Sequence, residues 1–399
     1  MIKKLSYIIL VSANMYAYSL TEILDHAKES HSAAVIKEKA ASDVANEELF
    51  TTYEAPHLGL SSTHAKAPAE DGLEYGLSFS QNISKPFGAT QKENASKYAI
   101  KAIEQKMEHE LHIFTLEVTA RYHNACVSKE MSETAQALYD EQSFRVTQLQ
   151  KAYDLGEISK QSLLFHKLDL VKLYQTLNTY KRNALEKTAY LNESVDNLVI
   201  NEVQCSDLVE IRKDIQLGEI TEHGEIQEIG FMKQSTDSLV SLQNTALSSL
   251  GYELMYNKEL DTTRYTFGVK IPMDFLSSQR ELEKAKYLHL DASIEAEKNS
   301  LMSKIQEHSN YMLLKVQTLY DEYMLFKEEL VPMSFELKEL SKTARLSGEG
   351  SMMEHLDSTR SYTQNVLEML EIKRKYYDEL FELYKTADLS LGEHCANIH

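Results

Sequence analysis

The chain has 399 residues, a formal net charge of −19, and only 13 glycines and 5 prolines. A chain of this length exceeds the usual size of one hydrophobic core, so we expect several domains or one elongated architecture. The acidic balance, with no basic stripe that could neutralise phosphates, argues against nucleic acid as a partner.

Residues 1–17 have the pattern of a secretory signal peptide. Lys3 and Lys4 precede a short apolar run from Leu5 to Ala13, and cleavage near Ala17 fits, with Met15 at its −3 position. The alternative is a buried N-terminal helix, and we expect export. No later apolar run reaches the roughly 18 residues of a transmembrane helix, so a membrane contact of the mature chain would have to use strands.

Residues 18–194 form a first predicted repeat. Leu20–Leu49 carries apolar residues at helical spacing, and Pro56 follows it. The alternating runs His57–Ser61 and Leu73–Gln81, separated by a polar loop over 64–72, predict a β-hairpin within 57–83. From Thr90 to Leu155 no proline or glycine occurs, which predicts one helix about 100 Å long.

A short turn at 155–159 interrupts the long helical pattern. Its glycine, Gly156, favours the positive φ that ends a helix, and Ser159 is a good N-cap for the next one. The turn returns at 347–351 with Gly348 and Ser351 in the same places. The chain is therefore predicted to be an internal duplication of one helical hairpin.

The helix after the first turn shows a seven-residue repeat, which indicates coiled-coil packing. The repeat consists of Leu163, Leu170, Leu177, Ala184 and Leu191. Residues 195–220 lose the pattern and are interpreted as an inter-repeat linker.

The second predicted repeat covers residues 221–392. A helix is expected between Ile220 and Leu247, and a second hairpin within 250–272. A long helix follows over Ser277–Leu346, with a bend expected at Pro332. The final helix is expected to run as far as Leu391, where Gly392 stops it. Residues 393–399 are predicted to be a loose tail.

Two hairpins supply four strands in each chain. The smallest membrane barrels need about eight strands, and open edges in lipid would leave backbone groups without partners. Oligomerisation is then required, with eight strands from two copies or twelve from three.

The ordered set of motifs resembles the TolC-like outer membrane efflux proteins, from about Ser19 to Leu391. It consists of the duplicated Gly-x-x-Ser turns, Leu356-Asp357-Ser358, Tyr265–Pro272 leading into a helix, and Leu389-Ser390-Leu391-Gly392. The resemblance implies a mainly α fold with a membrane β-barrel. Long helical hairpins would form a periplasmic α-barrel, and four strands per chain would contribute to a twelve-stranded barrel in a homotrimer.

The resemblance also implies partners and a location. The chain would lie in the outer membrane of a Gram-negative cell, in contact with its lipid, and reach across the periplasm. A periplasmic adaptor protein would dock on the tips at Gly156 and Gly348, and an inner-membrane pump of the RND or ABC type would supply energy. The metal-cation branch of the family is an alternative that no motif decides.

The resemblance places Glu354 and Asp357 at a narrowed entrance, where threefold symmetry would multiply them into rings of like charge. The other interpretation is that acidic residues stabilise the start of a helix. Arg345 and Gln161 occupy positions that hold the closed tip in relatives, although Arg345 replaces the usual aromatic residue. An ordinary solvated Arg345 is the alternative, since exposed ion pairs contribute little.

Four more tip residues are candidate adaptor contacts, namely Glu157, Ser159, Glu349 and Ser351. Six aromatic residues of the hairpins suit an outward-facing belt at the membrane interface, with a soluble sheet core as the alternative. They are Tyr75, Phe79, Tyr252, Tyr256, Tyr265 and Phe267.

The three cysteines, Cys126, Cys205 and Cys395, are too few for a disulfide scaffold. We expect free thiols, with a Cys205–Cys395 bridge as the alternative. His394, Cys395 and His399 are ligand types without the spacing of an established metal site, so no metal is predicted. No nucleophile elbow or phosphate loop is present, and we expect neither an enzyme nor a cofactor.

The sequence therefore predicts a passive outer membrane exit duct of a tripartite efflux or type I secretion system. The competing hypothesis is a soluble periplasmic coiled-coil adaptor or structural protein. Adaptors need one helical hairpin flanked by β-rich domains, whereas this chain has two, each preceded by a strand pair.

Overall fold

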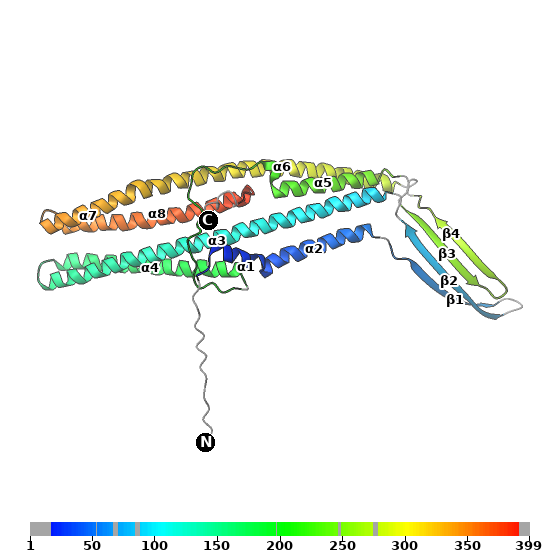
Figure 1. Ribbon diagram of the computed structural model, residues 1–399, viewed down its shortest axis with the longest axis horizontal. Coiled ribbons are helices and arrows are strands. Elements are labelled where there is room, and N and C mark those ends of the chain that lie inside the picture. The colour runs from blue at the N-terminus through cyan, green and yellow to red at the C-terminus, as the bar shows by residue number, and fades with distance from the viewer. Residues whose placement is uncertain are drawn as a thin grey trace, which may run out of the picture. The chain divides into compact units, whose positions relative to one another are not determined.

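A computed structural model of the chain describes residues 17–52, 54–66, 71–83, 88–196, 198–245, 249–273 and 278–390. The predicted signal peptide, apart from Ala17, lies outside these residues, as do the C-terminal residues His394, Cys395 and His399. Most described residues lie in helices, and the described part of the chain also has four β-strands (Figure 1).

The first repeat follows the predicted order of elements. Its elements are α1 (Leu20–Lys28), α2 (His31–Thr51), β1 (His57–Lys66), β2 (Asp71–Ile83), α3 (Ala89–Asp154) and α4 (Lys160–Ser194). Helix α3 has 66 residues, and its sequence holds no proline or glycine that would break it.

The second repeat has the same order with two added short segments. Its elements are the 3₁₀ turn η1 (Ile220–Glu222), α5 (Gly224–Leu242), β3 (Leu250–Lys258), β4 (Thr263–Lys270), α6 (Gln279–Leu325), the π-helical η3 (Phe326–Leu330), α7 (Val331–Ser347) and α8 (Met352–Thr386). The bend predicted at Pro332 stays a prediction, but the π-helical turn η3 immediately precedes α7, whose second residue is Pro332. A widened turn there suits a proline, which has no N–H to donate to the preceding turn.

Three predicted boundaries were wrong. The helix expected over Leu20–Leu49 breaks after Lys28, because the Ser30 hydroxyl donates to the Ala27 carbonyl at 2.7 Å and accepts from the Ala33 N–H at 3.2 Å. The loop expected at 64–72 is shorter, since β1 and β2 pair as far as Lys66 and Asp71. Helix α8 ends at Thr386 rather than near Leu391.

The end of α8 has a local cause. Asp388 adopts a φ of 51°, and the Leu389 N–H donates to the Tyr384 carbonyl at 2.9 Å. This left-handed residue with a backward hydrogen bond closes the helix before Gly392 is reached.

The chain divides into two compact units. Unit 1 consists of residues 1–35, 111–218 and 305–399, and unit 2 of residues 36–110 and 219–304. Unit 1 holds the helical hairpins with their tips, and unit 2 holds the sheet.

The sheet of unit 2 is antiparallel in the order β1-β2-β3-β4, so each hairpin contributes one adjacent strand pair. The two hairpins join through β2 and β3, with Leu77 opposite Tyr256 and Phe79 opposite Leu254. Strand β1 pairs only with β2 and β4 only with β3 among the described residues. The sheet therefore ends in two open edges.

The core of unit 1 is built around the inter-repeat segment 195–220. Val203, Val209 and Ile215 from this segment are buried in clusters with side chains of α3, α6 and α8. The hydroxyl of Tyr377 donates to the Val209 carbonyl at 2.7 Å. Its described residues from Leu198 to Glu219 form no helix or strand of their own apart from the isolated bridge of Val203 with Tyr18, and they pack as part of the core.

The cysteine prediction was wrong. Cys126 of α3 and Cys205 of the inter-repeat segment form a disulfide. The alternative of a Cys205–Cys395 bridge fails for the same reason. Fold packing brings the inter-repeat segment back onto α3, which no spacing in the sequence reveals.

Candidate functional site: the hairpin tips and the sheet face

Both tips of unit 1 are glycine turns of the same geometry. Gly156 and Gly348 have φ of 80° and 79°, and a Cβ added at either would meet nothing within 4 Å. The Glu157 N–H donates to the Ala152 carbonyl at 2.9 Å, and at the second tip the Glu349 N–H donates to the Ala344 carbonyl at 2.9 Å. Glycine is thus required here by backbone conformation alone.

The serines after the two glycines start the next helices. Ser159 accepts from the Ser162 N–H at 3.1 Å, and Ser351 accepts from the Glu354 N–H at 3.1 Å. The Glu354 carboxylate also accepts from the Ser351 N–H at 2.9 Å, which completes a capping box. Glu354 therefore stabilises the start of α8, which is the alternative role that the sequence offered for it.

The other predicted tip residues are placed as follows. Asp357 lies 3.7 Å from the guanidinium of Arg360, with 69% of its side chain exposed. Gln161 is exposed at the start of α4, whereas Arg345 is half-buried on α7. The role of Arg345 and Gln161 in holding the tip closed stays a prediction.

The four candidate adaptor contacts, Glu157, Ser159, Glu349 and Ser351, are all exposed. A leucine accompanies them at each tip, Leu155 with 75% and Leu346 with 74% of its surface exposed. Each tip thus combines carboxylate, hydroxyl and apolar groups in water.

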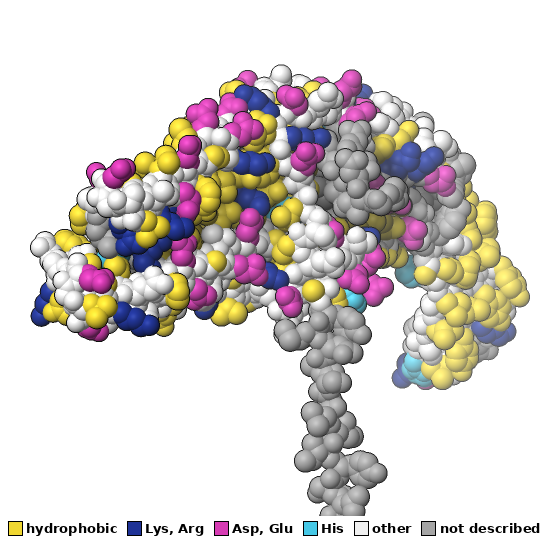
Figure 2. Space-filling view, turned by 60° about the vertical axis from the view of Figure 1, so that its left-hand side comes forward, with side chains coloured by type: hydrophobic (Ala, Val, Ile, Leu, Met, Phe, Trp, Pro, Cys, Tyr) yellow, Lys and Arg dark blue, Asp and Glu magenta, His cyan; other side chains and the backbone are white. Residues whose placement is uncertain are grey.

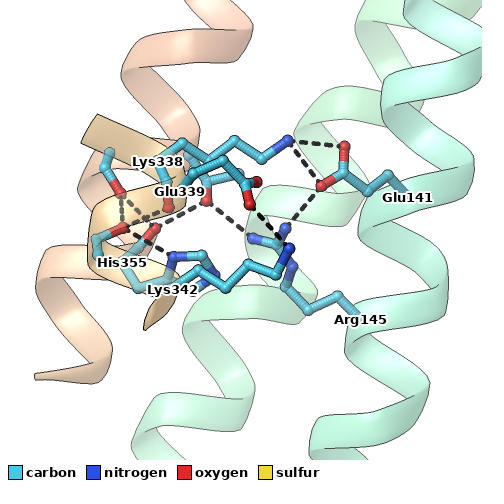
Figure 3. Close-up of polar contacts among 9 residues, drawn as sticks. Glu141, Arg145, Lys338, Glu339, Lys342 and His355 are labelled. Carbon is cyan, nitrogen blue, oxygen red and sulfur yellow. Dashed lines mark hydrogen bonds and ion pairs between the residues drawn. The ribbon is translucent and has the colours of Figure 1, made fainter. Parts of the chain in front are cut away.

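Sequence reasoning missed a polar cluster that joins the first hairpin to the second (Figure 3). We call it the inter-hairpin cluster; its members are Glu141 and Arg145 of α3, Lys338 and Ser341 of α7, and His355, Ser358 and Thr359 of α8. Lys338 donates to Glu141 at 3.0 Å, and Arg145 donates to the Thr359 hydroxyl at 2.9 Å.

The charges of this cluster are partly removed from water. The Lys338 side chain is 8% exposed and lies 4.8 Å from the ring centre of Tyr362, whereas the Glu141 side chain is 44% exposed. Burial alone would raise the pKa of Glu141, but the hydrogen bond from Lys338 and the charges of Lys338 and Arg145 hold that pKa below its usual value.

A second link between the hairpins joins α8 to α4. Arg360 makes a bidentate contact with Asp169, at 2.8 Å from Nε and 2.6 Å from Nη2. The Asp169 side chain is 13% exposed. Paired hydrogen bonds of this kind fix orientation as well as charge. The sequence shows Asp169 and Arg360, but it does not show that the two form an ion pair.

A cavity of about 720 Å³ opens between the two hairpins beside these links. Helix α3 lines it with Glu141 and Gln142, α4 with Asp169 and Tyr180, and α8 with Arg360. Apolar and charged groups alternate on its walls.

In unit 2 the six predicted aromatic residues lie on one face of the sheet. The register aligns Tyr256 with Tyr265 and Leu254 with Phe267, and the same face continues through Leu77 and Leu60. Tyr265 is 80% and Phe267 67% exposed. We call this surface the apolar sheet face. Figure 2 shows hydrophobic side chains gathered over the strands at the right.

The opposite face of the sheet carries small and polar side chains, such as Ser61, Ser78, Glu253 and Thr266. The sheet thus has the alternation of a two-sided surface, and its apolar side is exposed together with Ser61 and Thr266 of the polar side. A soluble sheet would bury its apolar side.

Comparison with solved structures shows which fold this is. The Campylobacter jejuni CmeC outer membrane channel superposes with a TM-score of 0.73 at 17% identity, over 92% of this chain and 85% of that one. The chain has the fold of an outer membrane channel. The Neisseria gonorrhoeae MtrE outer membrane channel in its open state gives 0.74 at 14% identity, over 92% and 88% of the two chains. CusC gives 0.77 at 12% identity, over 92% and 91%.

The TolC-like fold predicted from the sequence is confirmed by these likenesses. No family model matches the sequence, and no curated protein matches it. Among the described residues, no helix combines the length and hydropathy that crossing a membrane requires.

Proposed function

We propose that the chain is the subunit of an outer membrane efflux channel, a passive exit duct through which substrates leave the cell. The apolar sheet face carries this proposal, because an exposed sheet of aromatic and aliphatic side chains is suited to lipid contact. The fold shared with solved outer membrane channels supports it.

The two open edges of the sheet support a homotrimer. Four strands cannot close a barrel, and unpaired edges in lipid leave backbone donors and acceptors unsatisfied. In a trimer, β4 of one chain would pair with β1 of the next, giving twelve strands in all.

The exposed tips support docking of a periplasmic adaptor, with Leu155, Glu157, Leu346 and Glu349 as the groups within its reach. An inner-membrane pump of the RND or ABC type would then supply the energy. A tripartite efflux system or a type I secretion system is the assembly in which such a duct would work.

A matched pair of substitutions on β4 tests the role of the apolar sheet face. Phe267→Lys places a charge on that face, which costs about 2–4 kcal/mol at mid-membrane depth, whereas the neighbouring Thr266→Lys places the same charge on the polar face. We expect Phe267→Lys to lose, and Thr266→Lys to keep, heat-stable trimers in carbonate-washed outer membranes. Equal behaviour of the two variants, or release of the wild-type chain as a soluble monomer, would refute the channel.

The acidic entrance ring is proposed for Glu354 and Asp357 together. Glu354→Gln removes the charge but keeps a capping box, because glutamine can also accept from the Ser351 N–H. Asp357→Asn removes the second charge. We expect each variant to weaken, and the double variant to abolish, block of single-channel current by multivalent cations. Undiminished block in the double variant would rule out the ring.

A further inference from the structure

Two buried histidines lie between the hairpins of unit 1 and take no part in the proposed transport. His166 of α4 is 0% exposed, and neither of its ring nitrogens has a hydrogen-bond partner within the described part of the chain. His355 of α8 is 3% exposed, and its Nδ1 lies 3.0 Å from the Ser341 hydroxyl of α7. One histidine thus belongs to the first hairpin and the other to the second.

The surroundings of His166 are mainly cationic. Arg145 of α3, and His355 and Arg360 of α8, act on it as positive or protonatable groups, and Asp169 of its own helix is the one opposing charge among the groups that act most strongly. Asp169 is already engaged by Arg360 through two hydrogen bonds. A proton on His166 would therefore find little compensation.

His355 has a similar environment. Arg145 of α3 and Arg345 and Lys338 of α7 oppose its protonation, and Glu339 of α7 favours it. Glu339 is itself bound to Lys342 at 3.0 Å. The charge of Arg145 thus acts on both histidines, although they belong to different hairpins.

We propose that His166 and His355 form an acid-sensitive release point, at which uptake of a proton from water by either imidazole separates the first hairpin from the second. A proton would place a second positive charge beside Arg145 in a region closed to water. Moving the hairpins apart hydrates that charge. The inference concerns hairpin packing and holds whether or not the chain forms a channel.

The direction of the effect follows from the two pKa values. Burial, followed by the charge of Arg145, lowers the pKa of each histidine from 6.5 to about 4. The packed hairpins are thus fully stabilised above pH 6.5, and this stabilisation is lost as the pH falls toward 4. At pH 5 one histidine shifts the packing equilibrium toward separation by up to about 30-fold, and both histidines shift it further.

Hydrogen–deuterium exchange on the full-length protein in detergent tests the proposal. Exchange of tip peptides from α4 and α8 is compared between pH 7.5 and 5, after correction for the intrinsic pH dependence of exchange. We expect the wild type to lose protection at pH 5. His166→Leu should keep much of that protection, because leucine fills the site and cannot accept a proton, and the double variant with His355→Asn should keep most of it.

The exposed His308 of α6 provides the matched control, since His308→Asn removes an imidazole outside the hairpin interface. This variant should respond to acid like the wild type. Carboxylates titrate mostly below pH 5, so a response centred between pH 6.5 and 5 belongs to the histidines.

Two results would overturn the proposal. One is wild-type protection that does not change between pH 7.5 and 5, and the other is an unchanged loss of protection in the double variant. The pKa values can also be measured directly by NMR of the protein labelled with carbon-13 at its histidines. Two imidazole resonances should titrate near pH 4, and each should be missing from the variant that lacks its histidine. Titration of both near 6.5 would also refute it.

Discussion

Breaking the disulfide between Cys126 and Cys205 is predicted to loosen the middle of unit 1 while leaving the tips unchanged. The bond spans a sequence separation of 79 and encloses the first tip, α4 and the start of the inter-repeat segment. A loop of this length corresponds to about 4.5 kcal/mol of lost chain entropy in the unfolded state. This value is a ceiling, because Val203 is buried in the core beside Cys205 and is expected to hold the segment in place without the bond.

The assay compares the wild type with Cys126→Ser/Cys205→Ser in the full-length protein. Native-state hydrogen exchange should speed up in peptides from residues 198–218, by at most about three orders of magnitude, and much less in α8. Cys395→Ser is the control, because Cys395 lies outside this loop. Alkylation of both Cys126 and Cys205 in unreduced protein, or unaltered exchange in the double variant, would refute the reasoning.

Three further predictions concern the second tip and the inter-hairpin cluster. Gly348→Ala should destabilise it by about 1 kcal/mol through the positive φ alone, seen as faster exchange at the start of α8, and an unaffected tip would show that the turn relaxes. Ser351→Ala should cost about 1 kcal/mol in the same peptides by removing the capping box, with Ser351→Asp as the control that restores the cap. Glu141→Gln should destabilise unit 1 by about 3 kcal/mol in denaturant unfolding because it leaves the charge of buried Lys338 without its counter-charge, whereas Lys338→Met should cost less because half-exposed Glu141 can return to water. The reverse order of these last two would contradict the burial argument.

Much of the fold could be predicted because its signals are local. The absence of proline and glycine from 89–154 fixes a long helix, and Gly156 and Gly348 fix its turns. The alternation in the hairpins gave the aromatic face correctly, since a strand's two faces are set by residue parity. The break at Ser30 was missed because a serine inside an apolar pattern can cap a new helix or remain within one.

The candidate site was less predictable, because its contacts join residues far apart in the chain. Lys338 pairs with Glu141, and Arg360 with Asp169. On an isolated helix each of these charges has the pattern of a solvated face, and only the packing of one hairpin on the other buries them. The same holds for Cys126 and Cys205.

The two tips show how a duplicated sequence acquires distinct roles. Both turns share the glycine conformation and the serine cap, but only the second has a carboxylate three residues after its serine, and Glu354 uses it to close the capping box. Helix α4 has Ser162 at that place, and one turn later it carries His166, whose ring nitrogens have no hydrogen-bond partner among the described residues. The capping box stabilises the first turn of α8 as long as its hydrogen bonds are formed. A buried histidine, in contrast, stabilises the packing only while its imidazole is neutral. The two tips thus share the backbone turns that fix their conformation. The side chains that differ between them, such as His166, are the ones that can make the contact between the hairpins depend on pH.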